Sequence, residues 1–209
     1  MNKTARPVAQ ALLCATLLAC LTGCVEMVVG GAVMGAVATS DRRTFGAQTD
    51  DQAISVKGEL RVLKIAGDTG HVNVNSFNRK VLLTGEVKDA ATKAAVEADI
   101  KSIDGVQTVS NELDIAGPSS YTSRSNDTLI TTKVKASLVD MKTISANSFK
   151  VVTEHGTVYL MGRVSQREGQ VAADVARGVS GVQKVVKIFE YLSEEELKAF
   201  SAPAPSQGK

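Results

Sequence analysis

The 209-residue sequence contains no tryptophan, only eight Phe and Tyr residues, three cysteines and two histidines. No apolar run reaches the roughly 20 residues that a membrane-spanning helix needs, so we expect no spanning helix. All three cysteines, Cys14, Cys20 and Cys24, lie at the N-terminal end, and no disulfide can form within the chain that follows them. The folded part must therefore depend on core burial alone, which a domain of about 60–70 residues can just achieve.

Signatures of catalysis are also missing. The chain has no G-x-S-x-G, Walker or Rossmann fingerprint. Asp68-Thr69-Gly70 matches the triplet of aspartic proteases, but that chemistry needs two carboxylates sharing a proton, and no matching triplet recurs. His71 and His155 each lie beside a turn glycine, and a shared metal site would need further ligands. We therefore expect no converging catalytic group, no metal and no cofactor, and we do not expect an enzyme.

The N-terminal residues carry the first informative motif. Lys3 and Arg6 precede an apolar segment over residues 8–21, which is the layout of a secretory signal peptide over residues 1–23. Leu21-Thr22-Gly23-Cys24 resembles the lipobox of bacterial lipoproteins, Leu-(Ser/Thr/Ala)-(Gly/Ala)-Cys. The resemblance implies that the Cys24 thiol receives diacylglycerol and that its amine is acylated after cleavage. The alternative is a plain export signal that happens to precede a cysteine.

Removal of residues 1–23 would leave 186 residues (209 − 23) with 22 Lys and Arg (24 − 2) against 22 Asp and Glu. This neutral balance gives no reason to expect nucleic acid as a partner. Residues 24–49 are expected to form a lipidated N-terminus and a tether. Gly31 and Gly35 within it form a GxxxG that can pack helices closely, and a pliable tether near the membrane surface is the simpler interpretation.

Two copies of one unit make up the rest of the chain. Three sequence blocks recur in the same order at offsets of 76 or 77 residues: 51–54 with 127–130, 81–85 with 158–162, and 105–109 with 181–185. The pattern predicts two homologous domains over residues 50–117 and 126–192, joined by a turn-rich linker over residues 118–125. Residues 193–209 are expected to form a short helix after Ser193 and a disordered tail.

Each copy predicts the order helix, strand, strand, helix, strand. In the second copy Ile130, Val134 and Leu138 recur at helical spacing after Asp127, which is a fair N-cap. Residues 149–153 alternate as a strand, residues 154–157 form a turn, and residues 158–164 return as the second strand. A helix from about Ser165, with valines at 171, 175 and 179 on one face, precedes a last strand over residues 182–191. We predict an α+β fold with two helices packed on a three-stranded sheet in each domain.

The first copy differs at the start. Gly58 stands where the second copy has Val134. A glycine within a helix costs about 1 kcal/mol relative to alanine, and it also removes a core side chain. We expect the first helix to be short or frayed.

With these motifs in place, the chain resembles the dual BON-domain lipoproteins of the outer membrane. The resemblance is carried by the lipobox, Asp41-Arg42-Arg43-Thr44, Asn126-Asp127-Thr128 and Leu160-Met161-Gly162, and it covers nearly all of the chain after Cys24. It implies paired BON domains, anchoring at the outer membrane facing the periplasm, binding of anionic phospholipid, and a role in envelope integrity and at division sites. Val25-Glu26 behind the cysteine fits outer-membrane sorting.

The two predicted domains differ in charge. Residues 51–116 hold eight Lys and Arg against ten Asp and Glu, whereas residues 127–192 hold nine against six. This divergence indicates divergent partners. On the first helix of the second domain, apolar residues and lysines share the outward face, which suits an anionic headgroup layer. The residues expected to bind phospholipid are Leu129, Thr132, Lys133, Lys135, Ala136 and Val139.

In the resembling family this helix is the phospholipid-binding element, and it typically carries an aromatic residue where Leu129 stands. Leucine lacks the amphipathic ring that interfaces favour, so weaker binding is expected. The alternative is a solvated helix face with one stray leucine.

Three functions remain open from the sequence. The leading hypothesis is a non-catalytic lipid-binding module whose second domain binds anionic phospholipid such as phosphatidylglycerol or cardiolipin, while lipidated Cys24 holds the chain on the membrane. The second is an interaction scaffold, using exposed hairpins or the acidic first domain, for envelope-assembly or peptidoglycan-remodelling machinery, with envelope or division proteins as partners. The third is a structural spacer without a ligand.

Overall fold

The computed structural model describes residues 41–201, which belong to one compact unit of the chain. The predicted signal peptide, Cys24 and residues 202–209 lie outside the described residues. None of the helices between residues 41 and 201 combines the length and apolar character that crossing a bilayer requires.

The first domain begins with helix α3 (Phe45–Ala66), followed by a short 3-10 turn (Gly67–Thr69). Strands β1 (His71–Phe77) and β2 (Lys80–Val87) form an antiparallel hairpin, and helix α4 (Ala90–Lys101) comes next. Strands β3 (Thr108–Asn111) and β4 (Asp114–Ile115) both pair in parallel with β2, as one interrupted third strand.

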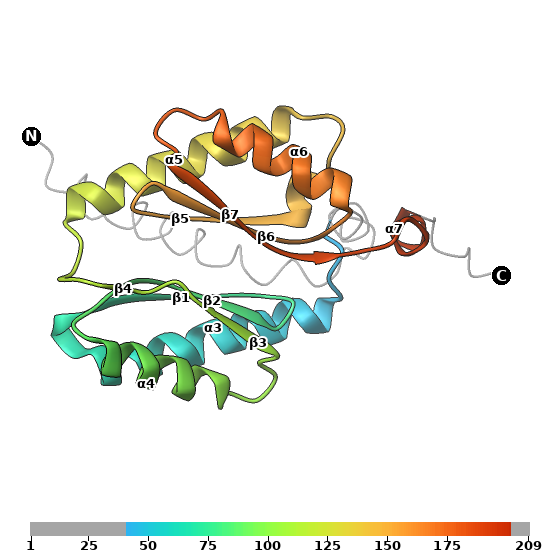
Figure 1. Cartoon of the computed structure of the whole chain (residues 1–209). Helices are drawn as coiled ribbons and strands as arrows, with labels where there is room; N and C mark the ends of the chain where they lie inside the picture. Colours follow the sequence, from blue (N-terminus) through green and yellow to red (C-terminus); the bar gives the residue numbers. More distant parts are fainter. Residues whose placement is uncertain (1–40, 202–209) are drawn as a thin grey trace, which may run out of the picture. The chain divides into compact units, whose positions relative to one another are not determined.

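The second domain repeats this order. It contains α5 (Tyr121–Asp140), a 3-10 turn (Ala146–Ser148), β5 (Phe149–Glu154), β6 (Thr157–Val164), α6 (Gln166–Arg177) and β7 (Lys184–Tyr191). The hairpin β5–β6 is antiparallel, and β7 pairs with β6 in parallel. A last helix, α7 (Glu194–Ser201), follows the domain. The predicted α+β fold with two helices packed on a sheet in each domain is confirmed, and the sheet has three strands in the second domain and four in the first, where the third strand is divided into β3 and β4 (Figure 1).

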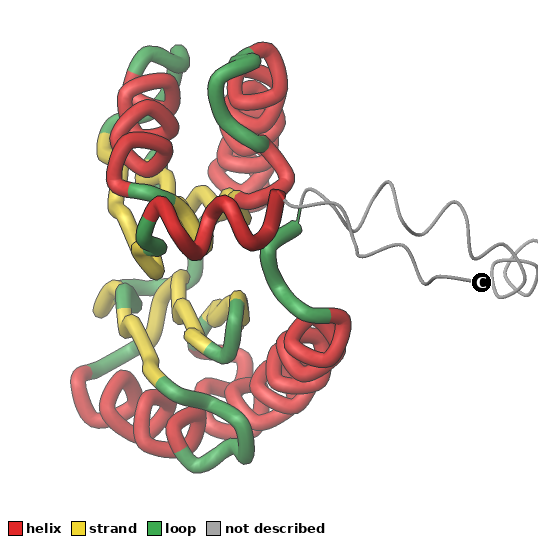
Figure 2. Tube along the Cα trace, turned by 90° about the vertical axis from the view of Figure 1, so that its right-hand side faces the viewer, coloured by secondary structure: helices red, strands yellow, loops and turns green. Residues whose placement is uncertain are grey.

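Each domain has its own hydrophobic core between its helices and its sheet. The stripe predicted for the second domain is confirmed, because Ile130, Val134 and Leu138 are all buried there. The opposite faces of the two sheets meet each other through a third apolar cluster that contains Phe77, Leu82, Tyr159 and Met161. The strands therefore lie between the two layers of helices, as Figures 1 and 2 show, and the outer faces of α3 and α5 belong to opposite layers.

The expectation of a short or frayed first helix was wrong. Helix α3 runs for 22 residues, with Thr44 as its N-cap and Gly58 buried in its middle. A Cβ atom at Gly58 would lie 2.7 Å from Cγ1 of Val74 and 3.2 Å from Cδ1 of Ile100. The missing side chain lets α3 lie close against β1, and tertiary packing here outweighs the weak helix propensity of glycine.

Asp127 is not an N-cap, which corrects a second prediction. Helix α5 begins earlier, at Tyr121, and the Ser120 side chain caps it by accepting a hydrogen bond from the Ser123 amide. The turn-rich segment predicted up to residue 125 is accordingly shorter. Asp127 is buried within the helix, where its carboxylate accepts hydrogen bonds from the backbone amides of His155 and Gly156 at 3.0 and 2.9 Å. It therefore fixes the β5–β6 turn against α5.

The predicted second helix of this domain starts at a capping box. The Ser165 side chain accepts a hydrogen bond from the Glu168 amide, and the Glu168 carboxylate accepts one from the Ser165 amide. The fully buried face of α6 is formed by alanines 172, 173 and 176, and the valines that we expected on that face are only partly buried. Small side chains thus set the close packing of this helix.

Candidate functional site

The outer face of α5 carries the predicted lipid-binding residues. All six of them, Leu129, Thr132, Lys133, Lys135, Ala136 and Val139, are exposed. Leu129 and Val139 are 60% and 68% exposed, although both are apolar. The helix can present them because Ile130, Val134 and Leu138 on its other face are anchored in the core.

An aromatic residue that the sequence analysis left in the linker joins this face. Tyr121 lies in the first turn of α5 and is 84% exposed, and the Arg124 guanidinium lies 5.3 Å from its ring centroid. Val139 is 18 positions after Tyr121 (139 − 121), which is five helical turns, so both lie on the same line of the helix. The signal that could have found it is Ser120, a good N-cap residue just before it. We call Tyr121, Leu129, Lys133, Ala136 and Val139 the α5 face.

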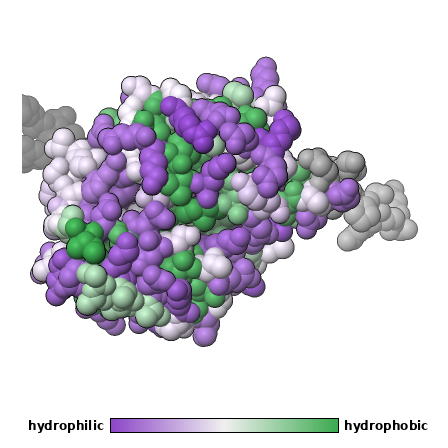
Figure 3. Space-filling view, viewed as in Figure 1, coloured by the Kyte–Doolittle hydropathy of each residue, from purple (hydrophilic) through white to green (hydrophobic). Residues whose placement is uncertain are grey.

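The surface seen in Figure 3 is mostly hydrophilic, with hydrophobic residues gathered in a few separate patches. Single exposed apolar residues are normal on soluble proteins. A row of them along one helix, with cations beside it, is the less common arrangement and favours a surface that meets an apolar or interfacial partner.

The first domain has its own exposed apolar row, which the sequence analysis did not identify. Val56, Leu60 and Leu63 follow one another at i, i+4 and i+7 along α3, and Leu63 is 68% exposed. Phe45, three turns before Val56, is 76% exposed. We call these four residues the α3 face.

A groove of about 520 Å³ lies beside α5, between the two domains. Arg124, Thr132 and Lys135 line it from α5, and His71 and Glu154 line it from the strands β1 and β5. Lys135 therefore faces this groove as well as solvent.

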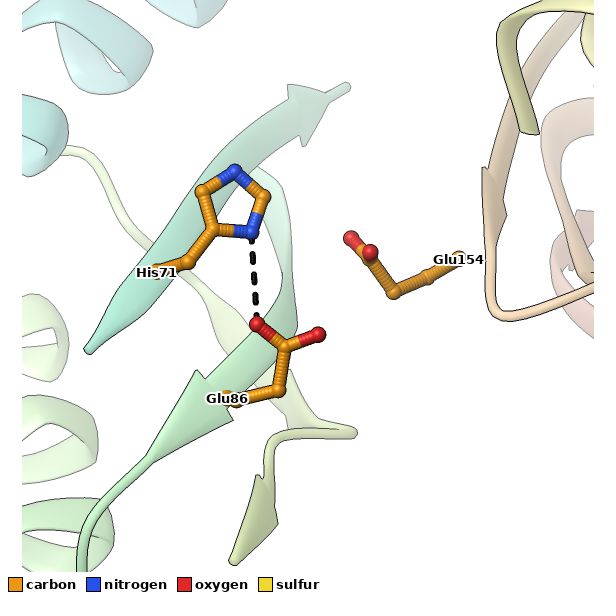
Figure 4. A group of neighbouring side chains, drawn as sticks. All are labelled: His71, Glu86 and Glu154. Atoms are coloured by element: carbon orange, nitrogen blue, oxygen red, sulfur yellow. Dashed lines mark ion pairs between the residues drawn. The ribbon is translucent and has the colours of Figure 1, made fainter. Parts of the chain in front are cut away.

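A cluster of titratable side chains lies at the strand end of the groove. His71 and Glu86 are opposite each other in the β1–β2 hairpin, and the Nδ1 atom of His71 is 3.5 Å from Glu86 Oε2. Glu154, at the end of β5 in the second domain, points its carboxylate toward this pair (Figure 4). One ligand atom from each of the three residues lies within 4.8 Å of the others. We call His71, Glu86 and Glu154 the interdomain triad.

The two carboxylates of the triad are buried, with Glu86 fully inaccessible to solvent. Burial raises the pKa of Glu154 above its usual value, although the hydrogen bond from Asn73 Nδ2 at 2.9 Å opposes this effect. His155 Nε2 lies 2.7 Å from Glu86 Oε1, in the manner of an ion pair rather than an aligned hydrogen bond. The sequence did not indicate that the two histidines meet at Glu86 from different domains.

Comparison with known proteins agrees with this architecture. The BON domain model matches residues 50–117 and 126–192. The chain is 40% identical over 174 residues to Outer membrane lipoprotein DolP of Haemophilus influenzae, which covers 82% of this chain and 90% of that protein.

Two further relatives are less similar. The 21 kDa hemolysin of Actinobacillus pleuropneumoniae is 32% identical over 154 residues, covering 73% of this chain and 79% of that protein. Osmotically-inducible protein Y of Escherichia coli is 29% identical over 150 residues, covering 70% and 75%. None of the three relatives bears the name of an enzyme. The chain belongs to the BON-domain family, as a two-domain outer-membrane lipoprotein.

Proposed function

We propose that the α5 face binds anionic phospholipid at the periplasmic side of the outer membrane. The observation that carries this proposal is the row of exposed Tyr121, Leu129 and Val139 beside Lys133 on one helix. Apolar side chains enter the headgroup boundary, and each lysine near an anionic surface contributes about 1 kcal/mol. Tyr121 supplies the interfacial aromatic ring that Leu129 lacks.

The N-terminal residues complete the proposal. Residues 1–23 serve as a signal peptide, and Cys24 carries the acyl chains. Asp41 is 17 positions after Cys24 (41 − 24), and that length of chain reaches at most about 60 Å. Two or more acyl chains suffice for stable anchoring. The α5 face is then not needed for attachment, and it determines where along the membrane the protein gathers, including division sites, in support of envelope integrity.

A vesicle assay tests the α5 face. The unit from Ser40 to Lys209, which has no Cys24, is mixed with vesicles of phosphatidylglycerol, of cardiolipin or of neutral phosphatidylcholine, at low and high salt. Salt-sensitive binding to the anionic vesicles is expected. Lys133→Glu replaces an attraction to the anionic surface by a repulsion, which makes the free energy of binding about 2 kcal/mol less favourable. Binding should therefore weaken roughly 30-fold. Leu129→Glu should weaken it as well.

Lys57→Glu on α3 is the matched control. Lys57 is exposed and the substitution changes the net charge equally, but the residue lies on the opposite helix layer. Its effect on vesicle binding should be small. Equal binding of the wild-type unit to neutral and anionic vesicles, or equal effects of the two lysine substitutions, would refute the proposal.

A protein-interaction role is the second candidate, and the α3 face favours it. Val56, Leu60 and Leu63 form an apolar row on the more acidic domain, turned away from the α5 face. Aliphatic side chains at this spacing can serve as anchors for an envelope-assembly or division protein. Photo-crosslinkers placed at Leu60 and at Leu129 in cells would distinguish the roles. Capture of one defined protein at Leu60 supports the scaffold, and lipid adducts at Leu129 support the membrane role.

A further inference from the structure

The interdomain triad combines the features of an ion site. His71 and Glu86 are held side by side by the β1–β2 register, and Glu154 comes from the facing strand of the other domain (Figure 4). Glu86 and Glu154 are 0% and 6% exposed. Two buried carboxylates brought this close to each other are costly unless a positive charge accompanies them.

The described residues supply only some of the hydrogen bonds that these buried groups can make. Glu86 Oε2 accepts a hydrogen bond from the Ser119 amide at 3.0 Å, and Glu154 accepts one from Asn73. Glu86 Oε1 and His71 Nδ1 are buried and make no aligned hydrogen bond among the described residues, and their nearest charged partners are His155 Nε2 at 2.7 Å and Glu86 Oε2 at 3.5 Å, respectively. Buried polar atoms are nearly always hydrogen-bonded, so two that lack an aligned hydrogen bond within one cluster favour a ligand between them.

We propose that His71, Glu86 and Glu154 bind a divalent transition-metal ion, represented by Zn²⁺, which joins the two domains. An imidazole nitrogen with two carboxylate oxygens suits zinc and its neighbours, whereas calcium and magnesium prefer oxygen ligands alone. Tetrahedral bonds of about 2.1 Å place ligand atoms about 3.4 Å apart. The His71–Glu86 separation of 3.5 Å already matches, and the 4.8 Å limit of the triad exceeds the tetrahedral separation by no more than about 1.4 Å (4.8 − 3.4).

The surroundings provide the remaining elements of such a site. His71 and Glu154 line the groove together with Asn73, so the triad is reached from the groove on that side. His155 and Asn73 contact the two carboxylates from outside the triad and orient them. Outer contacts of this kind typically change metal affinity 10–100-fold. The proposal does not depend on phospholipid binding by the α5 face.

Direct binding measurement tests the site. Full-length protein without a histidine tag is purified in detergent, stripped with a chelator and titrated with zinc sulfate against a chromogenic chelator. One zinc per chain is expected. His71→Ala and Glu154→Gln should each weaken binding at least 100-fold. His155→Asn should weaken it 10–100-fold, since asparagine tolerates the positive φ of 47° at this turn position. Glu59→Gln, an exposed carboxylate on α3, should leave binding unchanged.

A second readout does not require the variants to fold. Zinc should raise the thermal unfolding midpoint of the wild-type chain, and bound Co²⁺ should give visible absorption bands that show nitrogen and oxygen coordination. Absence of zinc binding to the wild type at micromolar concentration would overturn the proposal. So would equal affinity in wild type, His71→Ala and Glu154→Gln, because the ion would then lie elsewhere.

Discussion

Replacement of Asp127 by alanine should destabilise the second domain by several kilocalories per mole. The buried carboxylate accepts two backbone hydrogen bonds, from His155 and Gly156, and both join α5 to the β5–β6 turn. A hydrogen bond to a charged group contributes about 1.5–3 kcal/mol. Because the turn lies near solvent and water can reach one of the freed amides, the lower value applies to each bond, and the expected loss is about 3 kcal/mol.

Urea unfolding of the Ser40–Lys209 unit, followed by circular dichroism, measures this loss. Asp140→Ala is the matched control, since it removes the same charge from an exposed position on the same helix, and it should change the free energy of unfolding by less than about 0.5 kcal/mol. Asp127→Asn keeps one oxygen acceptor and should fall between the two. A loss for Asp127→Ala no larger than that of the control would refute the view that this carboxylate holds the turn.

Three further predictions follow from the packing and the charges. Gly58→Val places a branched side chain where even an added Cβ would lie 2.7 Å from Val74, so overpacking should lower the free energy of unfolding in urea by about 3 kcal/mol or more. A stabilised variant would show that α3 can move away from β1. Leu82→Ala removes a fully buried side chain between the two sheets, which should cost about 2–5 kcal/mol and separate the unfolding of the two domains in calorimetry. Burial acts to raise the pKa of Glu168, but hydrogen bonds from Arg42 and the Ser165 amide outweigh it and hold the pKa below 4.5. The stability that this carboxylate contributes is therefore present above pH 4.5 and is lost as the pH falls through the lowered pKa. Unfolding midpoints measured in that acidic range should fall less in Glu168→Gln than in wild type.

Local patterns in the sequence were sufficient for the element order. The spacing of Ile130, Val134 and Leu138 sets one buried face whatever the partner, and the Ser165–Glu168 capping box is complete within four residues. The internal repeat then carries each assignment from one copy to the other, which is why the α+β fold could be predicted without a structure.

Features that depend on distant partners could not be predicted in this way. Gly58 looked like a helix breaker because the side chain it accommodates, Val74, belongs to another element. Asp127 looked like an N-cap because Asp suits that position, whereas its real partners lie 28 and 29 residues away. The sequence feature that could have indicated this role is the matching Asp51 of the first copy, whose carboxylate also accepts hydrogen bonds from the amides of a hairpin turn.

Of the two candidate sites, one follows from a local sequence pattern and the other depends on distant residues. The exposure of Leu129 and Lys133 follows from helical periodicity, and sequence reasoning placed both correctly on the outer face of the helix. The interdomain triad depends on strand register within one domain and on contact with the other. Glu86 and Glu154 are 68 residues apart in the chain, and no local pattern links them.

Two adjacent arginines join the start of the folded unit to both domains. Arg42 forms a two-pronged contact with Glu168 of the second domain, with nitrogen–oxygen distances of 2.8 and 2.7 Å. Arg43 contacts Asp51 of the first domain at 2.8 Å. Asp51 in turn holds the β1–β2 turn, so the chain that arrives from the N-terminus is fixed to both domains within two residues.

This attachment has a consequence for the proposed membrane role. If residue 41 were connected to the domains by a flexible joint, the α5 face and the α3 face would have equal access to the membrane. The contact of Arg42 with Glu168 is partly buried and uses two guanidinium nitrogens, and lysine cannot reproduce it. The point at which the anchor segment meets the folded unit is therefore fixed relative to α5. Orientation at the membrane then depends on these arginines together with the α5 face, and substitutions at Arg42 should alter it even though Arg42 lies outside that face.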